Sequence, residues 1–263
     1  CKSARASVIP ARKAGRVHGR GDGKGRPGFA VKPGCVVSGV ALLDSVVITI
    51  DGPAGAGKTT AARRLAERLG LEYLDTGAGY RVAALAMQHA GLTPATADAT
   101  LADFLRTLTI ELQGTTARLN GNDVSQAIRA PAVSQWASQI AERPAVREFF
   151  KSWQRGWAQG RRFVTEGRDQ GTAVFPHAGC KFYLEADPEE RVDRRFRELC
   201  GRGQEISRAD VRAQQQERDQ RDMTRAIDRL EPAADAVRVN STHMTIDDVV
   251  DFMARHIRER LGL

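Results

Sequence analysis

Short apolar runs alternate with amphipathic stretches along most of this chain. Residues 46–50 are apolar and β-branched, which is typical of a strand buried on both faces of a parallel sheet. Similar runs predict four further strands, at 71–74, 163–166, 181–185 and 237–239. Because strands that alternate with helices form a parallel sheet covered on both sides, the pattern predicts an α/β fold.

Amphipathic helices are predicted between these strands. Ala62, Leu65, Ala66 and Leu69 recur on one helical face, and Gly70 follows at the position where a left-handed residue ends many helices. Further helices are expected over 80–90, 133–157 and 246–261, and another is expected to start at 187–190. One segment interrupts the α/β rhythm: residues 108–124 alternate in short runs around glycines, which predicts a small antiparallel hairpin.

The first 45 residues differ from the rest of the chain. They contain eight Gly and three Pro among scattered Arg and Lys, and they show no sustained period of 2 or 3.6. Such a segment lacks the apolar surface needed to offset chain entropy. We predict a disordered basic tail or a non-native extension over 1–45, followed by one folded domain over 46–263.

The net charge of +8 is a property of this tail. Residues 1–45 hold 9 of the 40 Lys and Arg but only 2 of the 32 Asp and Glu, so 31 bases face 30 acids in the remaining residues. The domain is therefore nearly neutral, and nucleic-acid binding is not expected apart from weak contacts of the tail. The chain also contains no apolar stretch of the ~20 residues that cross a bilayer, so no membrane partner is expected.

The four cysteines, at positions 1, 35, 180 and 200, form no CxxC pair and have no histidine at zinc-ligand spacing. A disulfide framework would be unusual in a chain of 263 residues. We therefore predict reduced thiols and a cytoplasmic location.

Residues 52–59 match the phosphate-binding pattern GxxxxGK[ST] in full, between a predicted strand and a predicted helix. The glycines let backbone N–H groups converge on a phosphate, Lys58 reaches the β- and γ-phosphates, and the Thr59 hydroxyl can hold Mg²⁺. ATP or GTP is thus the expected ligand. The residues predicted to bind it are Gly52, Pro53, Ala54, Gly55, Ala56, Gly57, Lys58, Thr59 and Thr60.

Two classes of P-loop protein fit the sequence poorly. A regulatory GTPase would need an NKxD signature, which does not follow the loop, and a motor or AAA-type ATPase would want a strand that ends in Asp rather than in Glu166 or Glu185. The chain is instead rich in arginine outside solvated runs. Arg218, Asp222 and Arg225 have the spacing of one helix face, for which a salt-bridged surface helix is the alternative interpretation.

Further motifs follow the loop in a fixed order. IDGPAGAGKTT is followed by LDTGAGYR, SQIAERPAVR, EGRDQGTAVFP, and ERDQRDMTR with EPAADA. In this order, from residue 46 to the C-terminus, they resemble bacterial cytidylate kinases. The resemblance implies a P-loop nucleoside monophosphate kinase fold, with a parallel sheet flanked by helices, an inserted monophosphate-binding lobe at about 76–160 and a lid at about 195–210. The hairpin at 108–124 would belong to the insert of the bacterial enzymes.

The resemblance also implies which residues form the site. The residues implied to bind the substrate CMP or dCMP are Thr76, Tyr80, Arg81, Ser138, Arg147, Arg168, Asp169, Arg218, Asp222 and Arg225. Among them, Ser138, Arg147 and Asp169 would read the base. The residues implied to be catalytic are Lys58, Arg168, Arg194, Arg195 and Arg218, with Thr59 on the metal. The chain departs from the family pattern at Gly79, Gln170 and Arg229, which bears on local packing and affinity.

The activity implied is transfer of the γ-phosphoryl group of ATP to CMP, with Mg²⁺ as cofactor. The acceptor phosphate oxygen is already ionised at pH 7, so arginines that neutralise phosphates are needed and a catalytic base is not. Another P-loop small-molecule kinase, including a UMP/CMP type, is the main alternative. A nucleotide-gated RNA-binding protein and a non-catalytic P-loop scaffold are weaker ones. A monomer is expected, while the relative use of CMP, dCMP and UMP stays open.

Overall fold

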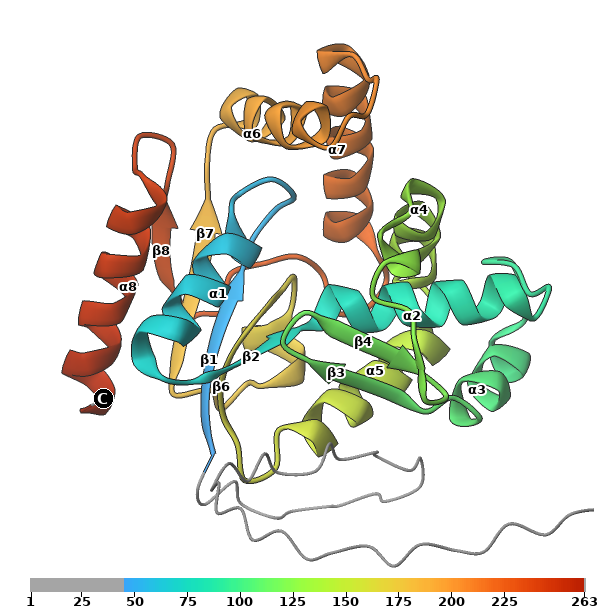
Figure 1. Cartoon of the computed structure of the whole chain (residues 1–263). Helices are drawn as coiled ribbons and strands as arrows, with labels where there is room; N and C mark the ends of the chain where they lie inside the picture. The colour runs from blue at the N-terminus through green and yellow to red at the C-terminus, as the bar shows by residue number, and fades with distance from the viewer. Residues whose placement is uncertain (1–44, 263) are drawn as a thin grey trace, which may run out of the picture.

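The computed structural model describes residues 45–262. A five-stranded parallel sheet has the strand order β2-β6-β1-β7-β8 (Figure 1). Its strands are β1 (Val46–Asp51), β2 (Glu72–Asp75), β6 (Arg162–Gly167), β7 (Cys180–Glu185) and β8 (Val237–Asn240). The predicted parallel α/β sheet is therefore confirmed, whereas the predicted tail lies outside the described residues, except for Ser45.

Eight α-helices connect and flank the strands within residues 45–262. They are α1 (Lys58–Leu69), α2 (Thr76–His89), α3 (Asp98–Arg106), α4 (Pro131–Ile140), α5 (Pro144–Trp157), α6 (Pro188–Gly201), α7 (Arg208–Thr224) and α8 (Ile246–Leu261). Side chains of β1 alternate between two cores: Ile48 and Ile50 pack with α1 and α8, whereas Val47 belongs to the core formed by α2, α3, α4 and α5. The sheet is thus covered on both faces, as its apolar strands require.

A small antiparallel sheet is inserted between α3 and α4. It consists of β3 (Ile110–Gln113), β4 (Thr116–Leu119) and β5 (Asn122–Asp123). Asn120 and Gly121 both have positive φ, of 50° and 83°, as a two-residue hairpin turn requires. The predicted hairpin is confirmed, and a short third strand extends it.

Some predicted boundaries are wrong. The helical stretch predicted over 133–157 holds two helices, α4 and α5, because the chain turns before Pro144, which starts α5. Helix α2 begins four residues earlier than expected: β2 runs directly into it, and the Asp75 side chain caps it by accepting from the N–H of Ala78 at 2.8 Å. The spacing of Arg218, Asp222 and Arg225 does not describe one helix, since α7 ends at Thr224.

Helices α6 and α7 form a hairpin that stands over the carboxyl edge of the sheet (Figure 1). Val192, Leu199 and Val211 make a small core between the two helices, separate from the two main cores. The hairpin is attached to the phosphate-binding loop by Asp219, which accepts from the backbone N–H of Ala54 at 3.1 Å. A helical pair with its own core can thus keep its shape while its position over the loop changes.

Candidate active site

The loop at 52–57 connects β1 to the first turn of α1 and has a backbone that only glycine adopts readily. Gly52 has φ of 148°, and a Cβ atom there would lie 2.0 Å from the carbonyl oxygen of Leu184. Gly57 has φ of 92° directly before α1 begins at Lys58. Apart from the N–H of Ala54, which donates to Asp219, this backbone directs N–H groups of the loop and of the α1 N-terminus to a place where an anion can bind, as the motif predicts.

Lys58 is buried at the bottom of this loop. Its side chain donates from Nζ to the carbonyl oxygen of Pro53 at 2.6 Å, and the residue is only 5% exposed. Burial, together with the positive charges of Arg168 and Arg218, lowers the pKa of Lys58 to about 7. A polyphosphate would supply the negative charge that this ammonium group needs.

Oxygen atoms suited to a hard cation lie beside Lys58. Thr59 donates from Oγ1 to the Glu166 carboxylate at 2.9 Å, and Thr76 donates to the backbone carbonyl of Glu166 at 2.7 Å. Mg²⁺ is usually held by one or two protein oxygens together with substrate phosphates. The hydroxyl of Thr59 and the carboxylate of Glu166 fit that donor set. No group of three or more metal-ligating His, Cys, Asp or Glu side chains occurs in residues 45–262.

Arginines that could bind an acceptor phosphate converge from three elements. Arg81 on α2 pairs with Asp75 at 3.1 Å, and Arg168 after β6 pairs with Asp222 on α7 at 2.7 Å. Arg218 lies one turn before Asp222 on α7, and its charge acts on both Lys58 and Arg168. The structure therefore brings the predicted phosphate-binding arginines to the same edge of the sheet.

A buried group of charges forms a second part of this site. Arg147 on α5, 2% exposed, contacts the carboxylate of Asp169 through Nη2 and donates from Nε to Asp228 at 2.7 Å. Arg225 places Nη2 3.5 Å from the other oxygen of Asp169. Burial raises the pKa of Asp169, while the two guanidinium groups oppose that shift. A carboxylate acceptor thus lies next to guanidinium donors, as recognition of a polar base edge requires.

The match to known proteins agrees with this geometry. The family model for cytidylate kinase matches residues 48–259, nearly the whole described domain. The chain belongs to the cytidylate kinase family. A cytidylate kinase from Rhodopirellula baltica is 42% identical over 214 residues, which cover 81% of this chain and 93% of the relative. Those from Fervidobacterium nodosum and Solibacter usitatus are 40% and 44% identical, covering 81% and 82% of this chain and 96% and 94% of the relatives.

Three further predicted residues of this cytidylate kinase family member lie on α6 and α1. Arg194 reaches the loop from α6: it donates to the Ser241 carbonyl at 2.7 Å and lies 3.5 Å from the Ala56 carbonyl. Arg195 instead pairs with Glu198 on the same helix at 2.8 Å and is partly exposed. Thr60, also assigned to the loop, is exposed in the first turn of α1. The structure therefore brings Arg194 to the loop and leaves Arg195 on the surface of α6.

The last two predicted residues, Tyr80 and Ser138, lie on helices α2 and α4. Tyr80 stacks on Phe150 with ring centroids 4.3 Å apart, and the Ser138 hydroxyl accepts from Arg221 at 3.3 Å. The departure at Gly79 has a packing reason, because a Cβ atom there would approach the Phe150 ring to 3.0 Å. Phe150 thus occupies the space that a larger residue at 79 would need.

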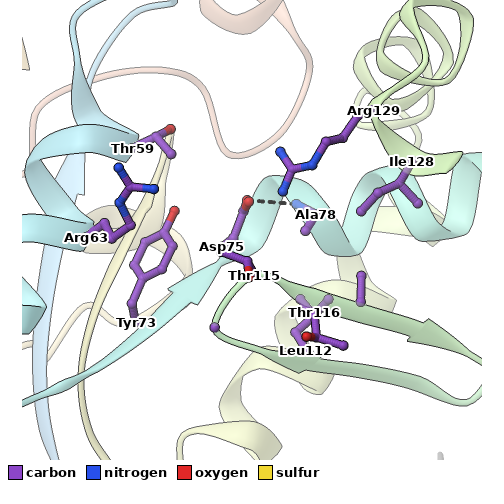
Figure 2. Close-up of a pocket in the computed structure, with 12 residues that line it drawn as sticks. Thr59, Arg63, Tyr73, Asp75, Ala78, Leu112, Thr115, Thr116, Ile128 and Arg129 are labelled. Atoms are coloured by element: carbon purple, nitrogen blue, oxygen red, sulfur yellow. Dashed lines mark hydrogen bonds between the residues drawn. The ribbon is translucent and has the colours of Figure 1, made fainter. Parts of the chain in front are cut away.

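A pocket between the loop helix and the inserted sheet adjoins this site (Figure 2). It is lined by Thr59 and Arg63 of α1, by Tyr73 and Asp75 of β2, by the β3–β4 turn and by Arg129. Thr59 belongs both to this pocket and to the pair with Glu166. The pocket therefore opens next to the atoms suited to Mg²⁺. No helix in residues 45–262 has both the length and the apolar character of a membrane span.

Sequence reasoning missed several acidic residues of the site. Asp51 is 4% exposed at the end of β1 and accepts from the N–H groups of Gln170 and Gly171 at 2.8 and 2.7 Å. Burial raises its pKa to about 7. The sequence does mark Asp51, because an acidic residue at the end of an apolar strand, directly before a phosphate-binding loop, indicates a residue of the site. Asp219 and Asp228 carry no comparable signal, since their partners are 165 and 81 residues away in sequence.

Proposed function

We propose that this protein transfers the γ-phosphoryl group of ATP to CMP, and to dCMP, giving the diphosphates. The observation that carries the proposal is the juxtaposition of two sites at one sheet edge. The phosphate-binding loop holds buried Lys58, and the Asp169–Arg147 pair is buried as well. Arg168 connects the two, because its charge acts on Lys58 and it directly precedes Asp169 in the chain. Membership of the cytidylate kinase family gives CMP as the acceptor.

The residues of the loop would bind and orient the donor. Backbone N–H groups of residues 52–59 and the ammonium group of Lys58 would hold the β- and γ-phosphates of ATP. Thr59, with Glu166 as its hydrogen-bond acceptor, would hold Mg²⁺, which when bound neutralises phosphate charge. Arg194 and Arg195 would complete the donor site from α6, Arg195 after leaving Glu198.

The acceptor phosphate would lie between Arg81, Arg168 and Arg218. Two polyphosphate groups repel each other, so converging guanidinium groups lower the barrier by neutralising the charge of both. Two of these arginines are paired with acids in the structure: Arg81 pairs with Asp75, and Arg168 pairs with Asp222. The incoming phosphate would compete for these guanidinium groups, and Asp222 together with Arg225 would then be free to contact the sugar.

The base would be recognised by an acceptor next to a donor. Cytosine presents an N4 amino group beside the N3 and O2 acceptors, whereas uracil presents O4 beside an N3–H group. Asp169 would accept from N4 and Arg147 would donate to the ring acceptors, with Ser138 nearby. Uracil would place its O4 oxygen against a carboxylate, which disfavours UMP.

Several finer features belong to the same proposal. The α6–α7 hairpin around residues 195–210 would act as the lid, and residues 76–160 would form the monophosphate-binding lobe. The protein would act as a monomer on free nucleotides, without a nucleic-acid partner. The cytoplasmic location predicted from the cysteines stays a prediction.

The test is an assay of the purified full chain with ATP, Mg²⁺ and a panel of nucleoside monophosphates. We expect CDP and dCDP to form faster than UDP, and no product to form from AMP or GMP. Product should require Mg²⁺ and should be lost in the Lys58→Ala variant. Phosphorylation of a different acceptor, with CMP left unchanged, would refute the proposed function.

A further inference from the structure

Asp228 lies in the segment between α7 and β8 and belongs to none of the sequence motifs. Its backbone is left-handed, with φ of 52°, and only Asn120 shares a positive φ among the described residues other than glycine. The side chain is 14% exposed. Its Oδ2 atom lies 2.7 Å from Nε of Arg147 and 3.2 Å from Nζ of Lys151. A strained backbone that delivers a carboxylate to a buried cluster needs an explanation.

The contacts of Arg147 indicate what Asp228 does. The Nε edge of the guanidinium group donates to Asp228, Nη2 contacts Asp169, and Nη1 has only a weak contact, 3.4 Å from the carbonyl of Ala141. Two carboxylates from different segments therefore fix the plane of one guanidinium group. Asp169 alone would leave the group free to turn about its Nη2 contact, because a single hydrogen bond does not define an orientation.

The charges of the cluster also indicate that Asp228 supports Arg147. Arg147, Lys151 and Arg225 are three cations near the two carboxylates of Asp169 and Asp228. Although burial opposes it, hydrogen bonding from Arg147 and the charges of Arg147 and Lys151 lower the pKa of Asp228, which is therefore ionised at neutral pH. Without Asp228, Arg147 would lose the acceptor of its Nε edge, whereas Lys151 would keep Glu148, 2.6 Å away. Asp169, the carboxylate that the base needs, would then be the only carboxylate that Arg147 contacts among the described residues.

The segment that carries Asp228 is itself held in place. The N–H of Leu230 donates to the carbonyl of Asp222 at 2.8 Å, and Arg229 donates from Nε to the carbonyl of Arg225 at 3.0 Å. Both bonds fasten the segment back onto the end of α7. Arg229, a departure from the family pattern, thus helps to fix the turn in which Asp228 adopts its left-handed backbone.

We propose that Asp228 is a positioning residue for base recognition, which holds Arg147 in the orientation that presents its Nη groups beside the Asp169 carboxylate. This inference rests on the proposed function, in which Arg147 and Asp169 read the cytosine edge. Asp228 contacts the base only through Arg147. It therefore contributes to the affinity for CMP and to the choice between CMP and UMP, and not to phosphoryl transfer itself.

The test uses variants that tolerate the backbone of residue 228. Asn and Gly both adopt positive φ, so Asp228→Asn and Asp228→Gly remove the charge, or the whole side chain, with little added backbone strain. Asp98→Asn is the matched control, because Asp98 pairs at 2.8 Å with Arg143, one turn before Arg147, outside the base cluster. Initial rates are measured with CMP and with UMP at saturating ATP and Mg²⁺, together with the melting temperature of each variant.

We expect Asp228→Gly to lower kcat/KM for CMP by about ten- to a hundredfold, mainly through KM. We expect Asp228→Asn to lower kcat/KM for CMP by a smaller factor, and both Asp228 variants to change kcat/KM for UMP little. Asp98→Asn should leave kcat/KM unchanged for CMP and for UMP. In an Arg147→Met background the Asp228 substitution should have no further effect on kcat/KM, since it acts through Arg147.

Equal losses for CMP and UMP, or losses that add to those of Arg147→Met, would show that Asp228 is merely structural and overturn the inference. So would Asp228 variants that behave like Asp98→Asn in a wild type active on CMP, with the proposed function left intact. A wild-type protein that neither binds nor phosphorylates CMP would refute the proposed function and this inference together.

Discussion

The substitution Asp169→Asn tests whether this protein selects cytosine by its charge pattern. The Asp169 side chain is 7% exposed and contacts Arg147 on one oxygen and Arg225 on the other. These contacts are also what a purely structural role for Asp169 would require. The asparagine keeps the shape and one acceptor oxygen, so it removes the negative charge with little change of volume.

The expected effects on the two substrates differ in size. The cytosine amino group exchanges a hydrogen bond to a charged acceptor, which contributes about 1.5–3 kcal/mol, for a weaker one to a neutral amide oxygen or for a clash with the amide N–H₂. The value of kcat/KM for CMP should therefore fall by roughly 10-fold, and by up to about 150-fold if the bond is lost altogether. Uracil gains an amide donor opposite its O4 oxygen, so kcat/KM for UMP should stay constant or rise. The ratio of the two values should therefore shrink by about tenfold or more.

The same change should destabilise the protein, because Arg147 and Arg225 lose a buried counter-charge. Breaking a buried pair costs about 3–5 kcal/mol when one partner is removed entirely, and less when an acceptor oxygen remains. At roughly 2–4 °C per kcal/mol for a domain of this size, a loss of about 2 kcal/mol lowers the melting temperature by about 4–8 °C. Kinetics must therefore be measured well below the melting temperature of the variant.

The assay is steady-state kinetics with CMP and UMP at saturating ATP and Mg²⁺. Asp235→Asn is the control, because Asp235 pairs with Lys181 at 2.8 Å but is half exposed and outside the base cluster. It should leave the CMP to UMP ratio unchanged. Equal fractional losses for CMP and UMP in Asp169→Asn would refute the reasoning and show that cytosine is read elsewhere.

Three further predictions concern the loop and the lid. In the nucleotide-free protein the pKa of Lys58 is lowered to about 7, so between pH 7 and about 10.5 the unfolded chain binds more protons than the folded one and the stability of the fold rises with pH. Lys58→Met should therefore raise the melting temperature more at pH 6.5 than at pH 9.5, and it should reduce turnover by ~10²-fold or more. A change in melting temperature that is the same at both pH values would contradict this. Gly52→Ala should abolish ATP binding, measured by calorimetry, because its Cβ atom collides with a carbonyl oxygen. Gly70→Ala, which also has a positive φ, of 64°, but lies in open space, should cost only about 1 kcal/mol and keep ATP binding. Asp219→Ala removes the acceptor of the Ala54 N–H and the partner of Arg191 on α6, so it should accelerate proteolytic cleavage of the α6–α7 hairpin. Unchanged cleavage would show that these contacts do not hold the hairpin in place.

How far the sequence predicts this structure depends on the range of the interactions. The strand at 46–50, the loop at 52–59 and the helix closed by Gly70 follow from local patterns, and the structure has them at β1, the loop and α1. Helix α3 carries buried Leu101 and Leu105 only, which is too sparse an apolar pattern to stand out. The end of α7 before Arg225 was missed because nothing between 208 and 224 marks a stop.

The residues of the site likewise divide into those that the sequence identifies and those whose roles depend on contacts between distant segments. Lys58 and Thr59 are identified by a contiguous motif, and Arg147 and Asp169 by resemblance to the family. Asp51, Asp219 and Asp228 acquire their roles only when distant segments meet, at 119, 165 and 81 residues of separation. Burial, which raises the pKa of Asp51 and lowers that of Lys58, is likewise a property of the packed domain and is not encoded near either residue.

Helix α7 has contacts at both of the proposed nucleotide sites, and this has a thermodynamic consequence. Its 17 residues extend about 25 Å. Asp219 contacts the loop of the donor site, Asp222 holds an acceptor-site arginine, and Arg225 follows its last turn beside Asp169. A nucleotide that immobilises one end of this helix reduces the freedom that the other nucleotide must remove on binding. Under the proposed function the two substrates would therefore be heterotropic effectors of each other, and whatever factor ATP contributed to the affinity for CMP, CMP would contribute equally to the affinity for ATP.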